Sequence, residues 1–426
     1  MADASTQPAR AGLLKAIYGK LRLLAYTRDF RGALGSLFRA AGMLSTGQFS
    51  RLAAKARGPR RTQKPAPVRT GPPLFLSGHI HGHGGYDHVV LKALVGLTAK
   101  NVNVFRDPRS WVEMDWVPDD AVPNERMYNF DTPRLAIIPP HLLYMFRPTE
   151  LTAAWTMWET DTIPAGSAKY LNKCGLVLVP SQWGVDCFRA NGVTVPMEMV
   201  PLGYDPDVFS PRPANSGPAV CTFGTAGALT EGGLRKNVQR VIDLFVKAFP
   251  AGEDVRLKVK ITPRSPMVNT HNDPRVEVIN TGLKPSELAD WYRSLTCYVN
   301  ASYGEGFGLH LLEAMGCGVP LVSTTFSAVG EVFDSAVGYE VNYKLVEAKN
   351  KVYSGRWADP DDEHLIARLR EVYADRATAD RLGSVAALRA PAFSWAAAIE
   401  KLTAALTKHG FLPPSAQLTA GTRSAA

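Results

Sequence analysis

NASYGEGFGLHLLEAMGCGVP, residues 300–320, joins a glycine-rich turn to an apolar helix pattern. It follows the apolar run Cys297–Asn300, which predicts a buried strand. Gly306 and Gly308 then open the backbone, and apolar side chains recur at helical spacing from Leu309 onward. A strand, a glycine turn and a helix in this order predict one unit of a parallel α/β sheet.

Two glutamates flank this turn. Glu305 lies just after the predicted strand, and Glu313 lies about two helical turns further on, so both can point at the same crevice. A helix N-terminus presents backbone N–H groups to a phosphate, and carboxylates accept hydrogen bonds from hydroxyl groups. The stretch therefore predicts a binding site for a phosphorylated polyol.

Two adjacent cations, Arg235 and Lys236, stand at the entrance of a helix that is predicted to start at Leu234. Cations near a helix N-terminus oppose the helix dipole. One interpretation is that a polyanion binds between them, and the alternative is a solvated pair of small energetic cost. The surrounding elements are the predicted strands Ala219–Gly224, Arg256–Ile261 and Val276–Ile279 and the predicted helix Pro285–Leu295.

The first half of the body shows the same alternation of short apolar runs and helical stretches. Tyr86–Leu97 is predicted to be a helix. Such alternation predicts a doubly wound, mainly parallel sheet, in which ligands bind beyond the carboxyl ends of the strands. The strand-like runs are Pro73–Leu76, Asn101–Phe105, Leu135–Ile138 and Gly175–Pro180.

The stretch HIHGHGGYDH, which follows the first of these strands, has two interpretations. On a regular strand, His79, His81 and His83 would share a face and form part of a zinc or iron site. Glycines at a strand-to-helix turn, here Gly84 and Gly85, instead bring backbone N–H groups up to an anion. A metal site would need further ligands, and no second cluster stands out in the sequence, which favours the glycine loop.

The stretch WTMWETD places Glu159 and Asp161 among aromatic residues. Aromatic faces beside carboxylates suit sugar hydroxyls, through apolar stacking and hydrogen bonds. The alternative is a pair of core tryptophans with two acids at the surface. Composition alone leaves both interpretations open.

Length and composition indicate a globular protein of two domains with extensions. The chain has 426 residues, of which 46% are hydrophobic and 20% charged. No apolar run reaches the roughly 18 residues that span a bilayer, and no secretory signal is recognisable, so a cytoplasmic protein is expected. The five cysteines include no Cys-x-x-Cys pair and are predicted to be buried, reduced thiols.

The net charge of +9 comes from the N-terminal extension, because residues 1–72 hold 14 Lys and Arg against 2 acids. Residues 1–70 are predicted to form basic amphipathic helices and a proline-rich linker. They would lie on an anionic membrane surface, making the protein peripheral on its inner face, or bind a protein partner. The alternatives are an arm that packs on its own domain and a transit peptide. Nucleic acid is not expected, because stacking aromatics are missing among the basic residues.

The spacing of Glu305 and Glu313, within Glu-Gly-Phe-Gly-Leu-x-Leu-Leu-Glu-Ala-Met, resembles the motif of retaining glycosyltransferases with the GT-B fold, of the family 4 or group 1 type. The likeness runs in the family's order from about residue 73 to about residue 410. Supporting stretches are Arg235-Lys-Asn237, Val179-Pro-Ser-Gln-Trp183, Val200-Pro-Leu-Gly-Tyr-Asp205 and Phe393-Ser-Trp395.

The resemblance implies an α/β fold of two Rossmann-like, doubly wound domains facing a cleft. The expected parts are the basic helical extension (1–70), an acceptor-side domain (71–205), a nucleotide-sugar-binding domain (206–390), a helix that crosses back to the first domain (391–412) and a flexible tail (413–426).

The resemblance also implies roles for individual residues. Arg235 and Lys236 would hold the donor diphosphate, and Glu313 the ribose hydroxyls. Three departures are His310 for the usual Pro, Glu159 for an acceptor-side His, and Gly224-Thr225 for Gly-Arg. The donor sugar would lie at Glu305 and at the backbone of Gly306, Phe307, Gly308 and Leu309. The diphosphate would also lie near Gly84 and Gly85. The acceptor would lie near Glu159, Asp161 and His83.

The expected activity is transfer of a sugar from a nucleotide-sugar donor to a polysaccharide, lipid-linked glycan or protein, with retention of configuration. No metal or other cofactor is expected. The alternatives are a catalytically silent GT-B scaffold or sugar-nucleotide-binding protein, a sugar-nucleotide epimerase on the same fold, and a metallohydrolase built on the histidine cluster.

Overall fold

The computed structural model divides the chain into two units, residues 1–65 and 66–426. The predictions for the basic extension up to residue 68, for His81 and His83, and for the tail from residue 415 lie outside the described residues. The structure describes residues 69–80, 84–107, 110, 117–126, 128–213, 217–229, 233–263, 265–348 and 352–414.

The first domain is built on a seven-stranded sheet in which every strand pairing is parallel. Its order is β3-β2-β1-β4-β5-β6-β7, so the chain winds from β1 to one edge and then, from β4, to the other. The strands are β1 (Pro73–Ser77), β2 (Asn103–Arg106), β3 (Asn124–Glu125), β4 (Arg134–Ile137), β5 (Thr152–Trp155), β6 (Leu176–Val179) and β7 (Met197–Met199).

Helix α4 (Gly85–Ala99) follows β1 and begins at the glycines of the HIHGHGG stretch. Its inner face is apolar, with Val89, Leu94 and Leu97 buried against the sheet. The other helical segments of this domain are η3 (Asp119–Ala121), η4 (Pro140–Phe146), α5 (Ser167–Leu171) and α6 (Gln182–Ala190).

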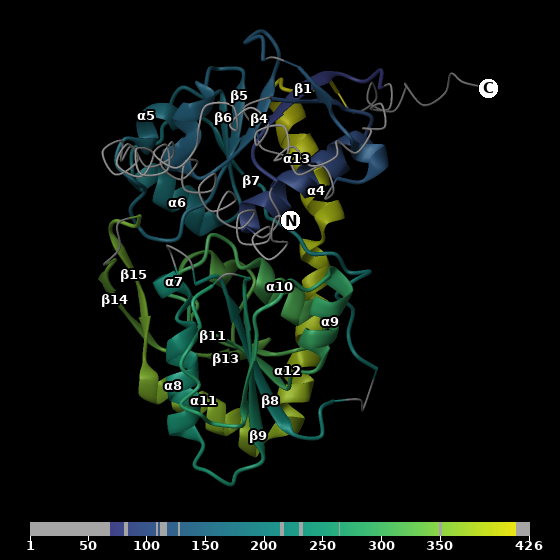
Figure 1. Cartoon of the computed structure of the whole chain (residues 1–426). Helices are drawn as coiled ribbons and strands as arrows, with labels where there is room; N and C mark the ends of the chain where they lie inside the picture. The colour runs from purple at the N-terminus through teal and green to yellow at the C-terminus, as the bar shows by residue number, and fades with distance from the viewer. Residues whose placement is uncertain are drawn as a thin grey trace, which may run out of the picture. The chain divides into compact units, whose positions relative to one another are not determined.

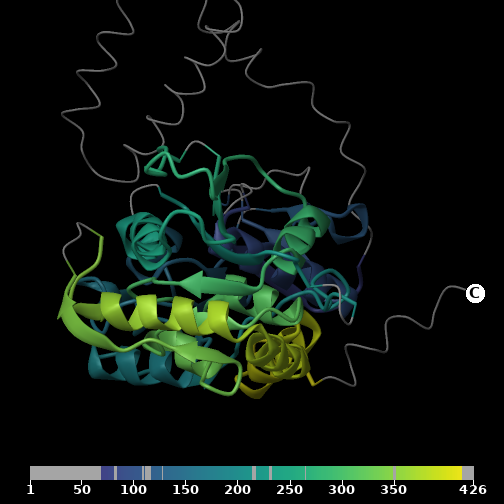
Figure 2. The ribbon, with the colours of Figure 1, turned by 90° about the horizontal axis from the view of Figure 1, so that it is seen from below.

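The second domain repeats the doubly wound order in a six-stranded sheet, β10-β9-β8-β11-β12-β13, again with parallel pairings. Figures 1 and 2 show helices against both faces of this sheet, with α8 and α11 on one side and α9, α10 and α12 on the other. The predicted fold of two Rossmann-like domains is confirmed. The strands are β8 (Cys221–Gly227), β9 (Val255–Ile261), β10 (Val276–Ile279), β11 (Cys297–Asn300), β12 (Leu321–Ser323) and β13 (Gly338–Glu340).

Two helices of the second domain, α11 and α12, are capped by aspartate side chains at their starts. Asp361 accepts a hydrogen bond from the His364 N–H at the start of α11, and Asp375 does the same for Thr378 in α12. The helices are α7 (Gly233–Lys236), α8 (Val238–Ala248), α9 (Pro285–Arg293), α10 (Leu309–Gly316), α11 (Asp362–Ala374) and α12 (Arg376–Arg389), with η5 (Ser327–Glu331) and η6 (Ala390–Phe393).

The predicted continuous helix from Leu234 is wrong, because the chain breaks at Asn237. Asn237 has a φ of 51°, in the left-handed region that asparagine tolerates better than most residues. Arg235 and Lys236 therefore belong to the short α7 and precede the first turn of α8, instead of lying in it. They precede the N-cap residue of α8, so they oppose the α8 dipole less strongly than cations in its first turn would.

A two-stranded antiparallel hairpin, β14 (Tyr343–Glu347) and β15 (Arg356–Pro360), leaves the second domain and contacts the first. Asp161 of the first domain pairs with the Arg356 side chain at 2.9 Å and accepts a hydrogen bond from its N–H at 2.7 Å. This hairpin was not predicted from the sequence.

After α12 the chain returns to the first domain through α13 (Trp395–Lys408), which packs on α4. A Cβ atom at Gly96 of α4 would lie 2.4 Å from Ile399 Cγ1, so the glycine permits this close approach. Tyr204 and Ser394 form a backbone bridge at the same crossing. Figure 1 shows α13 alongside α4.

All five cysteines are buried and free, as predicted. Burial raises the pKa of the Cys174 thiol to about 12, so it stays protonated at neutral pH. Within the described parts of the chain, no helix combines the length and the apolar character needed to cross a bilayer.

Candidate functional site

Two loops meet at the carboxyl edge of the second sheet. β8 and β11 are neighbours, and the chain leaves β8 towards β9 on one side and β11 towards β12 on the other. Ligands of doubly wound sheets bind outside such a switch point. The loop after β8 carries Arg235 and Lys236, and the loop after β11 carries Glu305, so three predicted site residues come together here.

One backbone hydrogen bond and one side-chain hydrogen bond join the two segments. The Tyr303 N–H donates to the Arg235 carbonyl at 2.9 Å, and Asn237 Nδ2 donates to the Ala301 carbonyl at 2.9 Å. The left-handed backbone at Asn237 thus serves two purposes, because it ends α7 and directs the amide to the β11 loop.

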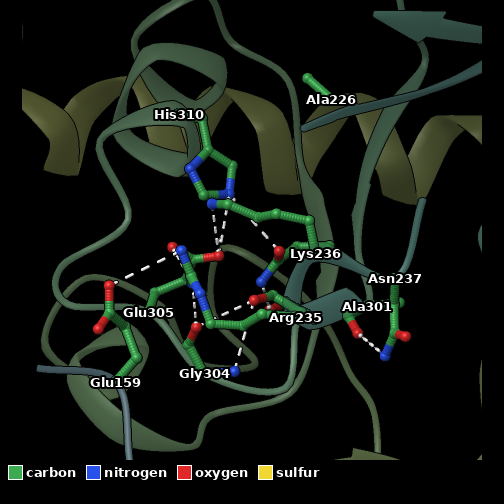
Figure 3. Close-up of polar contacts among 12 residues, drawn as sticks. Glu159, Ala226, Arg235, Lys236, Asn237, Ala301, Gly304, Glu305 and His310 are labelled. Carbon is green, nitrogen blue, oxygen red and sulfur yellow. Dashed lines mark hydrogen bonds and ion pairs between the residues drawn. The ribbon is translucent and has the colours of Figure 1, made fainter. Parts of the chain in front are cut away.

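Glu305 forms ion pairs with both cations (Figure 3). Lys236 Nζ lies 2.7 Å from Glu305 Oε1, and Arg235 Nη1 lies 3.1 Å from Glu305 Oε2. Arg235 also donates to the Gly304 carbonyl. The Arg235 side chain is 13% exposed, that of Lys236 17% and that of Glu305 6%. Little water therefore screens the charges of this cluster.

The cations keep this buried glutamate charged. Burial favours the neutral acid, but Arg235 and Lys236 outweigh it and hold the pKa of Glu305 below its ordinary value. Burial lowers the pKa of Lys236, against the attraction of Glu305. For Arg235 the neighbouring carboxylates outweigh burial and raise its pKa. The site therefore holds preformed positive charge already balanced by carboxylates.

Glu159 approaches the same cluster from the first domain. Its Oε1 lies 3.7 Å from Arg235 Nη2, and its side chain is 14% exposed. A Cβ atom at Gly304 would lie 2.3 Å from the Glu159 carbonyl oxygen, so the two loops are in direct backbone contact. The structure thus brings Glu159 to the cluster, whereas Asp161 turns to Arg356 of the hairpin. His83 lies outside the described residues.

His310 lies beside Glu305, with Nε2 4.0 Å from Glu305 Oε1 and 3.5 Å from Asn300 Oδ1. Burial, with Lys236 close by, lowers the pKa of His310 to about 3, so the ring is neutral at neutral pH. His310 was expected only as a departure from the family pattern, not as a site residue. A polar residue five positions after Glu305, at the start of the next helix, could have marked it.

Glu313 has different partners from Glu305. Helix α10 begins only at Leu309, so Glu305 lies in the loop before it, and the expectation that two helical turns separate the glutamates is wrong. The Tyr292 hydroxyl donates to Glu313 at 3.0 Å. Burial raises the pKa of Glu313 to about 7, and Lys260, which opposes this rise, faces it.

The glycines around Glu305 are required by close packing and by backbone conformation. A Cβ atom at Gly306 would lie 2.7 Å from Met157 Cγ of the first domain. Gly308 has a φ of 99°, in the left-handed region, and precedes the first residue of α10. Phe307 is buried in the core, and Leu309 is half-buried.

The glycines of the first sheet lie at the start of α4. The Gly84 N–H donates to the Asp87 carboxylate at 3.1 Å, an interaction that supplies negative charge to the helix N-terminus. A Cβ atom at Gly85 would meet no atom within 4 Å. Neither glycine has a positive φ, so what distinguishes Gly85 is the free space in front of it.

Three further residues near the site were not predicted. The Tyr353 ring, just before β15, lies 5.9 Å from the Arg235 guanidinium carbon. Tyr292 and Lys260 face Glu313. No local sequence signal indicates Tyr353, because the hairpin brings it to the site from a distant part of the chain.

No group of three or more His, Cys, Asp or Glu residues in the described part of the chain is arranged to hold a metal ion. Of the predicted histidine cluster, His79 is described, whereas His81 and His83 lie outside the described residues.

Comparison with protein families supports the interpretation of the second domain. Residues 223–359 match the family model described as "Glycosyl transferases group 1". This segment, from β8 to β15, contains Arg235, Lys236, Glu305 and Glu313. The resemblance inferred from the glutamate motif is confirmed at the level of group 1.

Among curated proteins, a D-inositol 3-phosphate glycosyltransferase of Arthrobacter sp. (strain FB24) is 34% identical over 146 residues. The match covers 34% of this chain and 28% of that protein, so the chain spans less than a third of the relative's length.

Among solved structures, sucrose-phosphate synthase from Thermosynechococcus elongatus is similar, with a TM-score of 0.59 and 15% identity over 79% of this chain and 98% of that one. Anabaena Alr3699/HepE, in complex with UDP and glucose, also has a TM-score of 0.59, with 12% identity over 79% of this chain and 100% of that one. At this identity the likeness concerns the fold.

Proposed function

We propose that this chain, which carries a group 1 glycosyl transferase domain, transfers a sugar from a nucleotide-sugar donor to an acceptor with retention of configuration. The observation that carries the proposal is the buried cluster of Arg235, Lys236 and Glu305 at the switch point of the second sheet. This is the edge at which doubly wound sheets bind ligands.

Arg235 and Lys236 bind the diphosphate of the donor. Loss of the nucleoside diphosphate builds negative charge on the leaving oxygen, and fixed cations in a site with little water stabilise that charge strongly. Glu305 holds both side chains, and Arg235 also donates to the Gly304 carbonyl, so the two cations need little reorganisation when the reaction occurs. The first turn of α10 adds backbone N–H groups.

Glu305 accepts hydrogen bonds from the donor sugar, next to the backbone of Gly306 to Leu309. Its lowered pKa keeps it an acceptor throughout the neutral range. Glu313 accepts hydrogen bonds from the ribose, and Lys260 opposes the loss of its charge. Gly84 and Gly85 line the donor side of the first domain.

In the reaction, the acceptor oxygen bonds to the anomeric carbon while the bond from that carbon to the phosphate oxygen breaks. The acceptor attacks from the face of the leaving group, and its proton passes to the leaving phosphate, so the configuration is retained. No metal is required, because Arg235 and Lys236 supply the positive charge. A catalytically silent protein would bind the donor without this step.

The acceptor is a polysaccharide, a lipid-linked glycan or a protein, and it binds on the side of the first domain. The name of the Arthrobacter relative adds D-inositol 3-phosphate to the acceptors to be tested. The basic residues 1–70 hold the protein at an anionic membrane surface or on a protein partner, at the cytoplasmic side.

Thermal unfolding of the full chain with UDP-, GDP- and ADP-sugars tests the proposal. A ligand at about 100 times its dissociation constant adds roughly 2.7 kcal/mol of stability, so the correct donor raises the unfolding temperature. Release of nucleoside diphosphate with each acceptor then measures turnover, and the anomeric configuration of the product reports retention. Absence of both stabilisation and turnover with every donor would contradict the proposal.

A further inference from the structure

Glu159 has a position that the proposed function does not explain. It comes from the first domain, yet its carboxylate lies 3.7 Å from Arg235 Nη2. Under the proposed function, Arg235 binds the diphosphate of the donor. A guanidinium group binds carboxylates and phosphates through the same planar set of N–H donors, so Glu159 and a diphosphate compete for it.

The loop that carries Glu159 leaves no space between itself and the Glu305 loop. A Cβ atom at Gly304 would lie 2.3 Å from the Glu159 carbonyl oxygen, and one at Gly306 would lie 2.7 Å from Met157 Cγ. Figure 3 shows the Glu159 carboxylate directed towards the Arg235 guanidinium group, which also pairs with Glu305. The Glu159 loop therefore packs directly against the loop where the proposed function places the donor sugar.

The charges around Glu159 are balanced before any ligand binds. Arg235 and Lys236 of α7 face two carboxylates, Glu159 and Glu305, the latter from the β11 loop. The neutral groups facing Glu159 are the hydroxyls of Tyr353, before β15, and Tyr86, at the start of α4. A diphosphate adds negative charge to this balanced set, so one carboxylate must lose its charge or leave.

Of the two carboxylates, Glu159 loses its negative charge more easily than Glu305. Glu305 lies within 3.1 Å of both cations, whereas Glu159 contacts only the guanidinium edge at 3.7 Å. Burial raises the pKa of Glu159, and the negative charge of Glu305 adds to that rise against Arg235 and Lys236, whereas the pKa of Glu305 is lowered. Once a diphosphate neutralises Arg235, the attraction that keeps Glu159 ionised is gone.

We propose that Glu159 is an internal competitor for the diphosphate site: it pairs with Arg235 until a nucleoside diphosphate group binds there, and it then takes up one proton from solvent. The inference rests on the proposed function, because it assumes that the diphosphate binds at Arg235 and Lys236. As a neutral acid, Glu159 remains beside the donor and donates a hydrogen bond instead of repelling the phosphates.

This proposal makes nucleotide binding depend on pH in a definite direction. Binding that takes up a proton weakens as pH rises, by up to about tenfold per pH unit above the pKa of Glu159 in the unliganded protein. In Glu159→Gln the side chain keeps its size and is neutral at every pH, so it neither competes nor titrates. The variant is expected to bind a nucleoside diphosphate about tenfold more tightly than wild type at pH 8.

The test is calorimetric titration of the full chain with UDP, GDP and ADP at pH 6 and pH 8, continued with the nucleotide that wild type binds most tightly. The terminal phosphate of these nucleotides also titrates near pH 6, but it does so equally for every protein, so the difference between wild type and Glu159→Gln isolates Glu159. Glu363→Gln is the control, because Glu363 is 77% exposed and pairs with Lys247, apart from the site.

We expect Glu159→Gln to bind the nucleotide more tightly than wild type at pH 8. Between pH 6 and pH 8, its dissociation constant should change by about tenfold less than the dissociation constants of wild type and Glu363→Gln. Equal or weaker binding by Glu159→Gln, while wild type binds the nucleotide, would overturn the inference and leave the proposed function standing. No binding of any nucleotide by wild type would overturn both. Glu159→Ala repeats the comparison, and thermal unfolding checks that the variants are folded.

Discussion

The two sheets of this protein share a strand order but differ at their carboxyl edges. At the second sheet, Arg235, Lys236 and Glu305 form a buried ion cluster. At the first sheet, the Tyr86 hydroxyl donates to the Met157 carbonyl and accepts from its N–H, both at 2.9 Å, and these groups are neutral. The shared topology sets where a ligand can bind, and the loop residues decide which chemistry the edge supports.

The largest effect is expected when Glu305, at the centre of the ion cluster, is removed. Glu305→Ala leaves two buried cations without their main counter-ion, so it should lower the free energy of unfolding by about 3–5 kcal/mol. Glu159→Ala should cost less, because Arg235 keeps Glu305. Urea unfolding of both variants measures the difference. Equal losses in the free energy of unfolding would mean that the carboxylates of the two edges contribute similarly to stability.

The next largest effect is expected on activity. Lys236→Ala removes one of the two cations placed to stabilise the leaving diphosphate, and should lower turnover about 10²–10³-fold. Lys247→Ala is the matched control, because Lys247 is exposed, lies in the last turn of α8 and pairs with Glu363. Initial rates with a nucleotide-sugar donor compare the two variants. Near wild-type turnover by Lys236→Ala would contradict a role of the second edge in the reaction.

Glu313 tests the second edge through pH. Its pKa is raised to about 7 in the folded protein from the ordinary 4.5, so the folded state binds more protons than the unfolded state between these values. Stability from this group is present at low pH and falls as pH rises through that window. Glu313→Gln should remove a loss of the order of 2 kcal/mol between pH 4.5 and 7. A free energy of unfolding that changes equally with pH in Glu313→Gln and in wild type would contradict the raised pKa of Glu313.

Gly85 tests the first edge. The free space in front of Gly85 lets Gly85→Val fold, with the free energy of unfolding changed by less than about 1 kcal/mol. If the donor passes this edge, the added side chain should reduce turnover about tenfold, and His81→Ala should reduce it less. A larger effect of His81→Ala, together with zinc in the purified protein, would instead favour the metal interpretation.

The smallest effect is expected at the rim of the first sheet. Glu198 of β7 pairs with Lys408 and His409 at the end of α13, and hydrogen bonds from His409 and Lys408 lower its pKa. These partners are solvated, so Glu198→Gln should cost less than about 1 kcal/mol, and less at high salt. A larger loss, measured by thermal unfolding, would show that this surface pair holds α13 in place.

Local patterns predicted much of the fold and part of the site. β10 and β11 have the predicted bounds, and β11 is fully buried, as its mainly apolar sequence indicates. Arg235, Lys236 and Glu305 were grouped through the family resemblance, and the structure brings them together. The pairing of Lys236 with Glu305 joins residues 69 positions apart, which no local period encodes.

What the sequence could not predict depends on contacts between distant segments. β14 is half of a surface hairpin with weak burial, so it has no apolar run to mark it. The position of Asp161 follows from its pairing with Arg356 of that hairpin, and Glu159 meets Arg235 only through packing of one domain on the other. The break between α7 and α8 comes from the left-handed backbone conformation of Asn237, which helical periodicity does not reveal.

The most direct test is a crystal structure of the full chain with bound UDP. The proposed function predicts both phosphates within hydrogen-bond distance of Arg235 and Lys236, with the ribose at Glu313. UDP bound at the first sheet instead, with its phosphates at the start of α4 and the Arg235, Lys236 and Glu305 cluster unchanged, would contradict it.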